Sequence, residues 1–402
     1  MRSLRLGTSS LVVAAFVGPG TVVTCAAAGV EFGYALGWVL VFSVLTVFVL
    51  QSFTANTGIL AGRGLGESIR ETITAPVPRF IAFGLVVLGL WVGAAAFEMG
   101  NLMGAAAGIT TLVDLPFDER WVVALLSAGA AAILLLDLRV LVWIFMALVI
   151  VMSVFFVGGL IVAPIDWSAA LRGLAVPQVP DGSVVTVIAL IGTTVVTYNL
   201  FLHASSAKHY WHDADDAMDA WWRELTGMAL FLPIGGLISF SILAAGATVV
   251  GTGVEPDVDA FGALLDPVAG PAARWLFGLG LFAAGLTSAL TAPLAAAAGI
   301  SELFGWTDDP QSSTFRAIWG SVIAAGFAFG MVGWSPLPAI VAAQAANGIL
   351  LPVIAAFVLY LTLRQDVVGF PLWYRALGVL VTLICAVLGA RTLWWVWTQV
   401  AG

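Results

Sequence analysis

A proline between two glycines interrupts the first apolar segment of the chain. The tetrapeptide Gly18-Pro19-Gly20-Thr21 lies in the middle of the apolar run 6–29. Pro19 cannot donate a helical hydrogen bond, and its ring clashes with the preceding turn. Gly18 and Gly20 allow the freed backbone to leave helical geometry at low cost. Since a broken helix at membrane depth must be buried in protein or line a cavity, this tetrapeptide is a candidate ligand site.

The composition is typical of a polytopic α-helical membrane protein. Of 402 residues, 61% are hydrophobic and 9% are charged, and the mean hydropathy is +1.06. A membrane helix needs about 20 apolar residues. We identify eleven such spans, at approximately 8–29, 34–58, 79–107, 120–137, 139–163, 183–204, 223–251, 272–303, 314–333, 336–363 and 371–399. The expected fold is therefore all-α, with residues 1–402 forming a single transmembrane domain.

The sequence shows no pattern typical of an enzyme or of a nucleic-acid-binding protein. Lys208 is its only lysine, and no basic cluster occurs. Cys25 and Cys385 lie in apolar segments, away from any metal-site spacing. No nucleophile–base pair is evident, so we expect no enzymatic activity and no cofactor. The start of the chain resembles a signal peptide ending near Cys25, but the ten later spans favour a first membrane helix.

The basic residues predict an inner (plasma) membrane protein with a cytoplasmic N-terminus and an external C-terminus. Of the 15 basic residues, eleven fall on the side of the N-terminus and four on the other side. The eleven are Arg2, Arg5, Arg63, Arg70, Arg79, Arg139, Lys208, Arg223, Arg316, Arg364 and Arg375, and the four are Arg120, Arg172, Arg274 and Arg391. The expected partners are the lipid bilayer and a small solute or ion. The oligomeric state does not follow from the sequence.

Glu98 is the only ionisable residue that we place deep within a predicted span. An intramembrane carboxylate is costly, and it faces a protein interior or a cavity. It either binds a proton or cation, or it is a structural acid hydrogen-bonded between helices. We favour the first interpretation. Asn101 lies three residues further on and shares its helical face.

Polar side chains crowd the end of the sixth span, between Thr193 and His203. Three threonines, a tyrosine and an asparagine lie within seven residues. A threonine can bond its own helix, so each alone says little. Together with Tyr198 and Asn199 they predict a polar cavity. His203 shares the face of Asn199 but lies near the cytoplasmic end, where histidines are more often exposed or capping than ligands.

Gln344 and Asn347 lie three residues apart in the tenth span. They either line the same cavity as the sixth span or bond one helix to another. The sequence favours neither interpretation over the other. Small residues elsewhere in the spans, such as Gly285, predict close helix packing.

With these motifs in view, the chain resembles the Nramp family of divalent-metal transporters along almost its whole length. Gly18-Pro19-Gly20-Thr21 is similar to the Asp-Pro-Gly-Asn of the family's first helix, and 199–203 (Asn-Leu-Phe-Leu-His) matches its sixth. Weaker similarity covers 50–66, 285–291, and Gln344 with Leu351 and Pro352. The resemblance implies a LeuT-like fold with inverted repeats at 8–163 and 183–363 and an extra helix at 371–399. Helices one and six would be broken around one substrate.

The resemblance also shows that the family's metal ligands are missing. Gly18, Thr21 and Val196 stand where the family has an aspartate, an asparagine and a methionine. The family's helix-6 proline and histidine are replaced by Thr197 and Tyr198, and its helix-3 acidic pair by Glu98 and Asn101. Transition metals prefer imidazole, thioether and carboxylate ligands. We therefore assign no metal ligand set from the sequence.

These departures favour a secondary transporter with a changed substrate, a small anion such as bicarbonate or a small polar solute. Without the aspartate, the positive ends of the half-helices are unopposed. The alternative is a transporter of Mg²⁺ or Mn²⁺ bound with much of its water; a channel or a non-transporting sensor is less favoured. The predicted substrate-binding residues are Gly18, Gly20, Thr21, Val196, Thr197, Tyr198, Asn199, Gln344 and Asn347, and the proton-coupling candidates are Glu98, Asn101 and His203.

Overall fold

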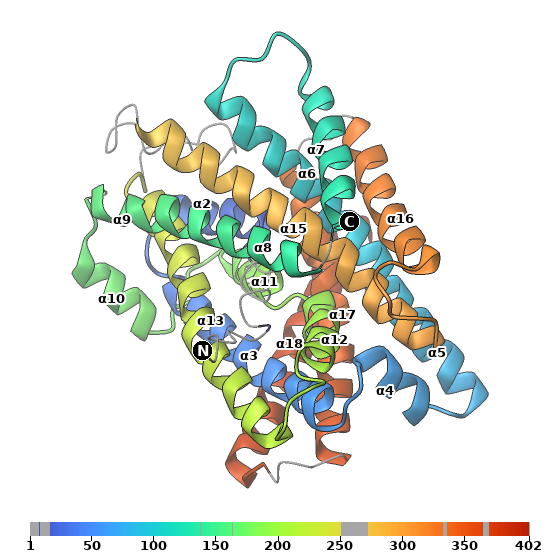
Figure 1. Cartoon of the computed structure of the whole chain (residues 1–402). Helices are drawn as coiled ribbons and strands as arrows, with labels where there is room; N and C mark the ends of the chain where they lie inside the picture. Colours follow the sequence, from blue (N-terminus) through green and yellow to red (C-terminus); the bar gives the residue numbers. More distant parts are fainter. Residues whose placement is uncertain are drawn as a thin grey trace.

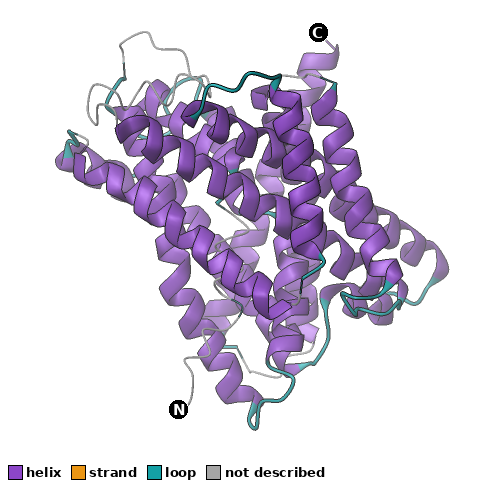
Figure 2. Ribbon diagram, turned by 45° about the horizontal axis from the view of Figure 1, so that its top comes forward, coloured by secondary structure: helices purple, strands orange, loops and turns teal. Residues whose placement is uncertain are grey.

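The computed structural model describes residues 8, 17–136, 138–162, 164–250, 272–332, 336–364 and 370–401. Within these residues the chain is helical, with no strand, and the helices pack side by side as one bundle (Figure 1, Figure 2). The first half of the bundle contains α2 (Pro19–Phe32), α3 (Gly37–Ala55), α4 (Leu65–Thr72), α5 (Pro76–Val87), α6 (Gly93–Leu112), α7 (Glu119–Leu134), α8 (Leu138–Met152) and α9 (Gly158–Val162). The second half contains α10 (Trp167–Ala175), α11 (Val184–Thr194), α12 (Thr197–Tyr210), α13 (Ala217–Ala247), α15 (Ala272–Phe304), α16 (Ser313–Met331), α17 (Pro336–Arg364) and α18 (Leu372–Ala401).

Eight stretches of the described chain are long and apolar enough to cross a membrane. They are Gly37–Leu60, Pro76–Leu112, Trp143–Ile161, Val184–Tyr210, Ala217–Ala247, Phe277–Phe304, Ser313–Met331 and Leu372–Arg391. The other three predicted spans correspond to α2, α7 and α17, of 14, 16 and 29 residues. The all-α membrane fold predicted from the sequence is confirmed.

Three predicted spans contain a short π-helical turn that the sequence did not indicate. These turns are η1 (Asn56–Leu60) after α3, η2 (Leu88–Val92) between α5 and α6, and η3 (Ser153–Val157) between α8 and α9. A π-turn adds a residue to one turn of the helix and shifts every later side chain around the axis. The turn η2 therefore sets which face of α6 carries Glu98 and Asn101.

The sixth span is broken, as predicted. The helix α11 ends at Thr194 and α12 begins at Thr197, and Val196 between them is extended (φ −92°, ψ 128°). In the first span, α2 begins at Pro19, after Gly18 in an extended conformation (φ −111°, ψ −178°). The predicted helix preceding this break, residues 9–16, lies outside the described residues. The break at the first tetrapeptide is thus confirmed on its α2 side.

Small residues allow close packing between the helices next to the two breaks and their neighbours. The helix α15 runs along α6 through the middle of the bundle (Figure 1). On the other side, α2 packs against α13 through two glycines. A Cβ atom added to Gly29 would lie 2.1 Å from the carbonyl oxygen of Leu243, and one added to Gly246 would lie 2.4 Å from that of Ala26. Because no larger residue fits, the position of α2 is fixed by this contact.

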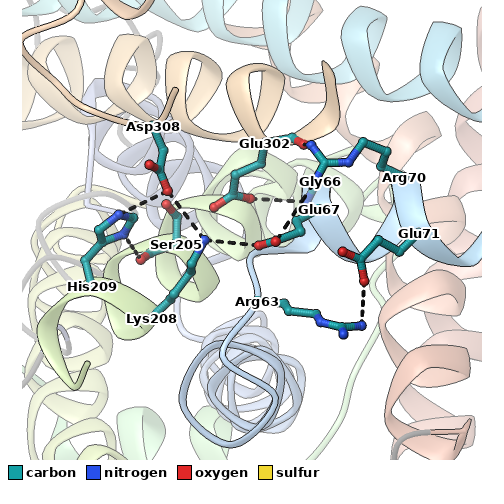
Figure 3. Close-up of polar contacts among 10 residues, drawn as sticks. All are labelled: Arg63, Gly66, Glu67, Arg70, Glu71, Ser205, Lys208, His209, Glu302 and Asp308. Atoms are coloured by element: carbon teal, nitrogen blue, oxygen red, sulfur yellow. Dashed lines mark hydrogen bonds and ion pairs between the residues drawn. The ribbon is translucent and has the colours of Figure 1, made fainter. Parts of the chain in front are cut away.

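A group of charged side chains, which we call the inner cluster, joins three elements at one end of the bundle (Figure 3). Lys208 of α12 pairs with Glu67 of α4 at 3.0 Å and with Asp308, after α15, at 3.4 Å. His209 also contacts Asp308, at 3.1 Å. The carboxylate of Glu302 accepts from the backbone N–H of Gly66 at 3.3 Å. We call this the inner end, because the predicted orientation places it in the cytoplasm.

Candidate functional site

Asn347 of α17 holds the two halves of the broken sixth helix together. Its Oδ1 accepts from the backbone N–H and the hydroxyl of Thr197, at 3.0 and 2.9 Å. Its Nδ2 donates to the carbonyl oxygens of Gly192 and Val195, at 2.8 and 3.0 Å. The side chain thereby satisfies backbone groups that both helix ends leave open. Of the two roles left open by the sequence, bonding between helices is the one that Asn347 fills.

The start of α2 is packed tightly between α6 and α15. A Cβ atom added to Gly18 would lie 2.6 Å from the hydroxyl oxygen of Ser288 and 3.7 Å from Oδ1 of Asn101. A Cβ atom added to Gly104 would meet the ring of Pro19 at 2.4 Å. The space next to residue 18 is therefore filled by Ser288, a residue that sequence reasoning did not select.

Thr21 links the two broken helices directly. Its hydroxyl lies 3.0 Å from the hydroxyl of Thr193 at the end of α11, and Thr21 is fully buried. Val196 and Gly20 are buried next to the same breaks. The structure thus brings together the predicted residues of α2, α11 and α12. For Gln344, only the backbone within α17 is described, so its predicted role stays a prediction.

Several buried polar atoms near the breaks have no hydrogen-bond partner among the described residues. They are both carboxyl oxygens of Glu98, Oδ1 of Asn199, Oγ of Ser288 and Nδ2 of Asn101. Most buried polar atoms in proteins are hydrogen-bonded. A group of buried polar atoms without partners therefore indicates a site for a ligand, a proton or water. The Asn199 oxygen and the ionised form of Glu98 can only accept, the Ser288 hydroxyl can donate or accept, and Nδ2 of Asn101 donates.

Glu98 lies on α6 between α16 and the start of α12. Its aliphatic part rests against Gly326, where an added Cβ would be 2.5 Å from Cγ of Glu98. The Asn101 amide is the polar neighbour of its carboxyl group, and the Tyr198 phenol lies within electrostatic range. The Tyr198 ring packs edge-on against Phe97 at 5.7 Å. Glu98 and Asn101, which were predicted to share a helical face, therefore lie beside Tyr198 of the sixth span.

His203 is buried, contrary to the interpretation that favoured an exposed or capping histidine. Only 1% of its surface is accessible, and both ring nitrogens are engaged. Nδ1 lies 2.7 Å from the hydroxyl of Thr54, and Nε2 lies 3.3 Å from Oε1 of Glu224. The expectation failed because α3 and α13 cover this face of α12, which the position of His203 along the chain cannot show.

Two further buried carboxylates escaped the sequence analysis, Glu224 on α13 and Glu302 on α15. They are 0% and 4% exposed. Each lies in an end turn of a predicted span, where an acid is usually solvated. A third buried polar residue, Ser288, lies within the stretch 285–291 that resembles the family. Among the described residues, no group of three or more His, Cys, Asp or Glu side chains is arranged to hold a metal ion.

Comparison with known proteins gives a consistent result. The family model "Natural resistance-associated macrophage protein-like" (Nramp) matches residues 9–395. The divalent metal cation transporter MntH of Burkholderia ambifaria is 28% identical over 375 residues, covering 90% of this chain and 82% of that protein. MntH of Verminephrobacter eiseniae is 28% identical over 393 residues, covering 95% and 86%.

Solved structures show the same fold. A histidine-to-alanine mutant of the Eremococcus coleocola manganese transporter superposes with a TM-score of 0.76 at 21% identity, covering 96% of this chain and 85% of that one. The transporter MhsT in complex with L-phenylalanine gives a TM-score of 0.57 at 16% identity, covering 96% and 98%. The LeuT-like arrangement expected from the sequence is confirmed by these neighbours.

Proposed function

Since the chain belongs to the Nramp family of membrane transporters, we propose that it carries a hard divalent cation, Mg²⁺ or Mn²⁺, together with part of its water. The structural observation that carries this proposal is the set of unpaired buried oxygens of Glu98, Asn199 and Ser288. Hard cations bind carboxylate, amide and hydroxyl oxygens and retain water where the protein supplies few ligands. One carboxylate with neutral oxygens suits an ion whose charge is partly screened by its own hydration shell.

The side chain at position 196 bears on the choice of metal. Val196 occupies the extended link of the sixth helix, where the family resemblance places a methionine. A thioether ligand selects softer transition metals. Its loss, with the loss of the aspartate at Gly18, is expected to lower the preference for Mn²⁺ over Mg²⁺. The names of the MntH relatives support a divalent cation as the substrate class.

The interpretation favoured by the sequence alone, a small anion or polar solute, is now our second candidate. An anion at the start of α12 would find the first backbone N–H, that of Thr197, already donated to Asn347. The unpaired atoms near the breaks are mostly acceptors, which repel an anion. No lysine or arginine is among the buried side chains of the described residues. A neutral solute with donor groups is compatible with this arrangement, and an anion is disfavoured.

The test is uptake of Mg²⁺ and Mn²⁺ into proteoliposomes that contain the purified protein and an internal metal indicator. We expect saturable uptake that Glu98→Gln lowers at least tenfold. The matched control is Glu31→Gln, which removes an exposed carboxylate on α2 and should leave uptake unchanged. If folded protein moves neither ion and bicarbonate or a polar solute accumulates instead, the metal proposal is wrong.

A further inference from the structure

We propose that the inner cluster is an ion-pair latch that joins two packed blocks of the bundle at the inner end. Lys208 of α12 clamps α4 and the segment after α15, and its ion pairs break each time that end opens. Such a latch requires a transporter whose two ends open in turn, but it requires no particular substrate.

The first block consists of α2, α3, α12 and α13, which meet at backbone distance. The contact of α2 with α13 through Gly29 and Gly246 is described above, and α13 also packs along α3. The turn η1 directly follows α3. A Cβ atom added to Gly58 of this turn would lie 2.4 Å from the carbonyl oxygen of Ala204 on α12. Helices that touch through their backbones in this way are expected to move together, because no side chain separates them.

The second block consists of α4, α6 and α15. A Cβ atom added to Gly66 of α4 would lie 2.4 Å from the carbonyl oxygen of Gly299 on α15, and α15 runs along α6. Arg70 of α4 also donates to the carbonyl oxygen of Glu302, at 2.8 Å. The helix α4 is therefore fixed to the second block, although it follows α3 in the chain. Residues 61–64 connect the two blocks, and Gly62 among them has a positive φ of 64°, which favours glycine.

Side chains, rather than backbones, are in contact where the two blocks meet near the breaks. A Cβ atom added to Gly104 of α6 would meet the ring of Pro19 of α2, and one added to Gly18 would meet the hydroxyl of Ser288. The substrate site proposed above lies at this boundary, with Gly18 in the first block and Glu98 and Ser288 in the second. Rocking of one block against the other around a fixed site is the general route to alternating access.

Lys208 crosses the boundary between the blocks at the inner end (Figure 3). Its Nζ lies 3.0 Å from Oε2 of Glu67 on α4 and 3.4 Å from Oδ2 of Asp308, after α15. Nε2 of His209, the next residue of α12, lies 3.1 Å from the same oxygen of Asp308. The side chains of Lys208, Glu67 and Asp308 are partly buried, so salt screens their pairs less than it screens fully exposed charges. Each such pair contributes little by itself, which suits a contact that breaks in every transport cycle.

Ser205 and Glu302 are buried at the same boundary, next to the latch. Ser205 lies on α12 and is 5% exposed, and Glu302 lies on α15 and is 4% exposed. The Ser205 side chain meets the Glu302 carboxylate across the boundary. Separation of the two blocks at the inner end would therefore expose Ser205 to water. This makes position 205 a reporter of the state of the latch.

A thiol at position 205 tests the latch without any substrate. The chain has two cysteines, so Cys25→Ala and Cys385→Ala with Ser205→Cys leave one thiol. The measurement is its rate of labelling by N-ethylmaleimide, an uncharged reagent, in purified protein. Lys208→Met keeps the approximate length of the side chain and removes its charge. We expect it to raise the labelling rate several-fold, whereas Lys208→Arg should retain the slow rate.

The matched control is Glu71→Gln. Glu71 also lies on α4, but it pairs at 2.6 Å with Arg63 of its own segment and does not reach α12 (Figure 3). This substitution should leave the labelling rate unchanged. Added NaCl should raise the rate in the reporter protein with Lys208 intact, a measurement that needs no change in the latch. A rate that responds neither to Lys208→Met nor to salt would overturn the proposal.

A zero-length crosslink then tests whether the latch must break during transport. Lys208 is the only lysine, so a carbodiimide can join its amine to Glu67 or Asp308 as an amide, and mass spectrometry locates the bond. The crosslinked protein should lose at least tenfold in uptake of whichever solute the untreated protein carries, and labelling at position 205 should cease. Lys208→Arg protein treated in the same way cannot form this amide and is the control. Uptake or labelling that persists in fully crosslinked protein would refute the latch. If neither metal ion is transported, the labelling result still decides.

Discussion

Replacing Asn347 with leucine should destabilise the fold substantially, because one side chain serves both ends of the broken helix. The substitution keeps the approximate volume but removes all four hydrogen bonds. It leaves the N–H and hydroxyl of Thr197 and the carbonyls of Gly192 and Val195 without this partner. Hydrogen bonds inside membrane proteins contribute about 0.6 kcal/mol each on average, and an unsatisfied buried group costs about 1–3 kcal/mol.

For four bonds at about 0.6 kcal/mol each, the expected loss is about 2.4 kcal/mol in the free energy of unfolding. The measurement is equilibrium unfolding in mixed micelles, followed by tryptophan fluorescence. Asn101→Leu is the matched control, because Asn101 is similarly buried (4% exposed against 2% for Asn347) but its Nδ2 is unpaired. The control should lose less than half as much. If Asn347→Leu costs no more than Asn101→Leu, the reasoning from the four bonds is refuted.

Two further predictions concern the substrate site. Gly18→Asp with Thr21→Asn and Val196→Met should begin to restore Mn²⁺ binding in calorimetry only when Ser288→Gly is added, because the Ser288 hydroxyl occupies the space that the new Cβ needs. Equal binding with and without Ser288→Gly would contradict this steric argument. Glu98→Gln should abolish any proton movement that accompanies transport, measured as pH change inside proteoliposomes, since both carboxyl oxygens lack other partners. Unchanged proton movement would exclude Glu98 from that role.

The parts of the fold that the sequence predicted are those set by local chemistry. Pro19 between two glycines marks the start of α2, because this pattern disfavours a continuous helix wherever it occurs. The break of the sixth helix, by contrast, was implied by the family resemblance at 199–203. Packing between distant segments was not predictable in this way. The η2 turn before α6, the burial of His203 and the contact of Ser288 with Gly18 depend on helices that are not neighbours in the sequence.

Asn347 illustrates the same limit for the candidate site. Its spacing from Gln344 is equally compatible with a ligand and with a bond between helices. The distinction depends on where the ends of α11 and α12 lie, which no property of the tenth span encodes. Glu224 differs, because an acid in the end turn of an apolar span is usually solvated, whereas here it is buried in contact with Thr8, Trp211 and His203.

The arrangement of groups around the breaks constrains how a substrate can be selected. Asn347 takes the first N–H of α12, and the Thr21 and Thr193 hydroxyls bond each other, so these groups are already engaged. Ser288 fills the space beside Gly18 that a carboxylate would need. Among the described residues, the carboxyl group near the breaks is that of Glu98, with neutral oxygens around it. A site with one charge and few ligands discriminates between cations mainly by the cost of removing their water. Since Mg²⁺ keeps its water more strongly than larger divalent ions do, such a site can accommodate it only with much of that water in place. Selectivity in this chain is therefore expected to depend on the size of the hydrated ion, and substitutions that change cavity volume around Gly18 and Ser288 should alter it more than substitutions that change ligand chemistry.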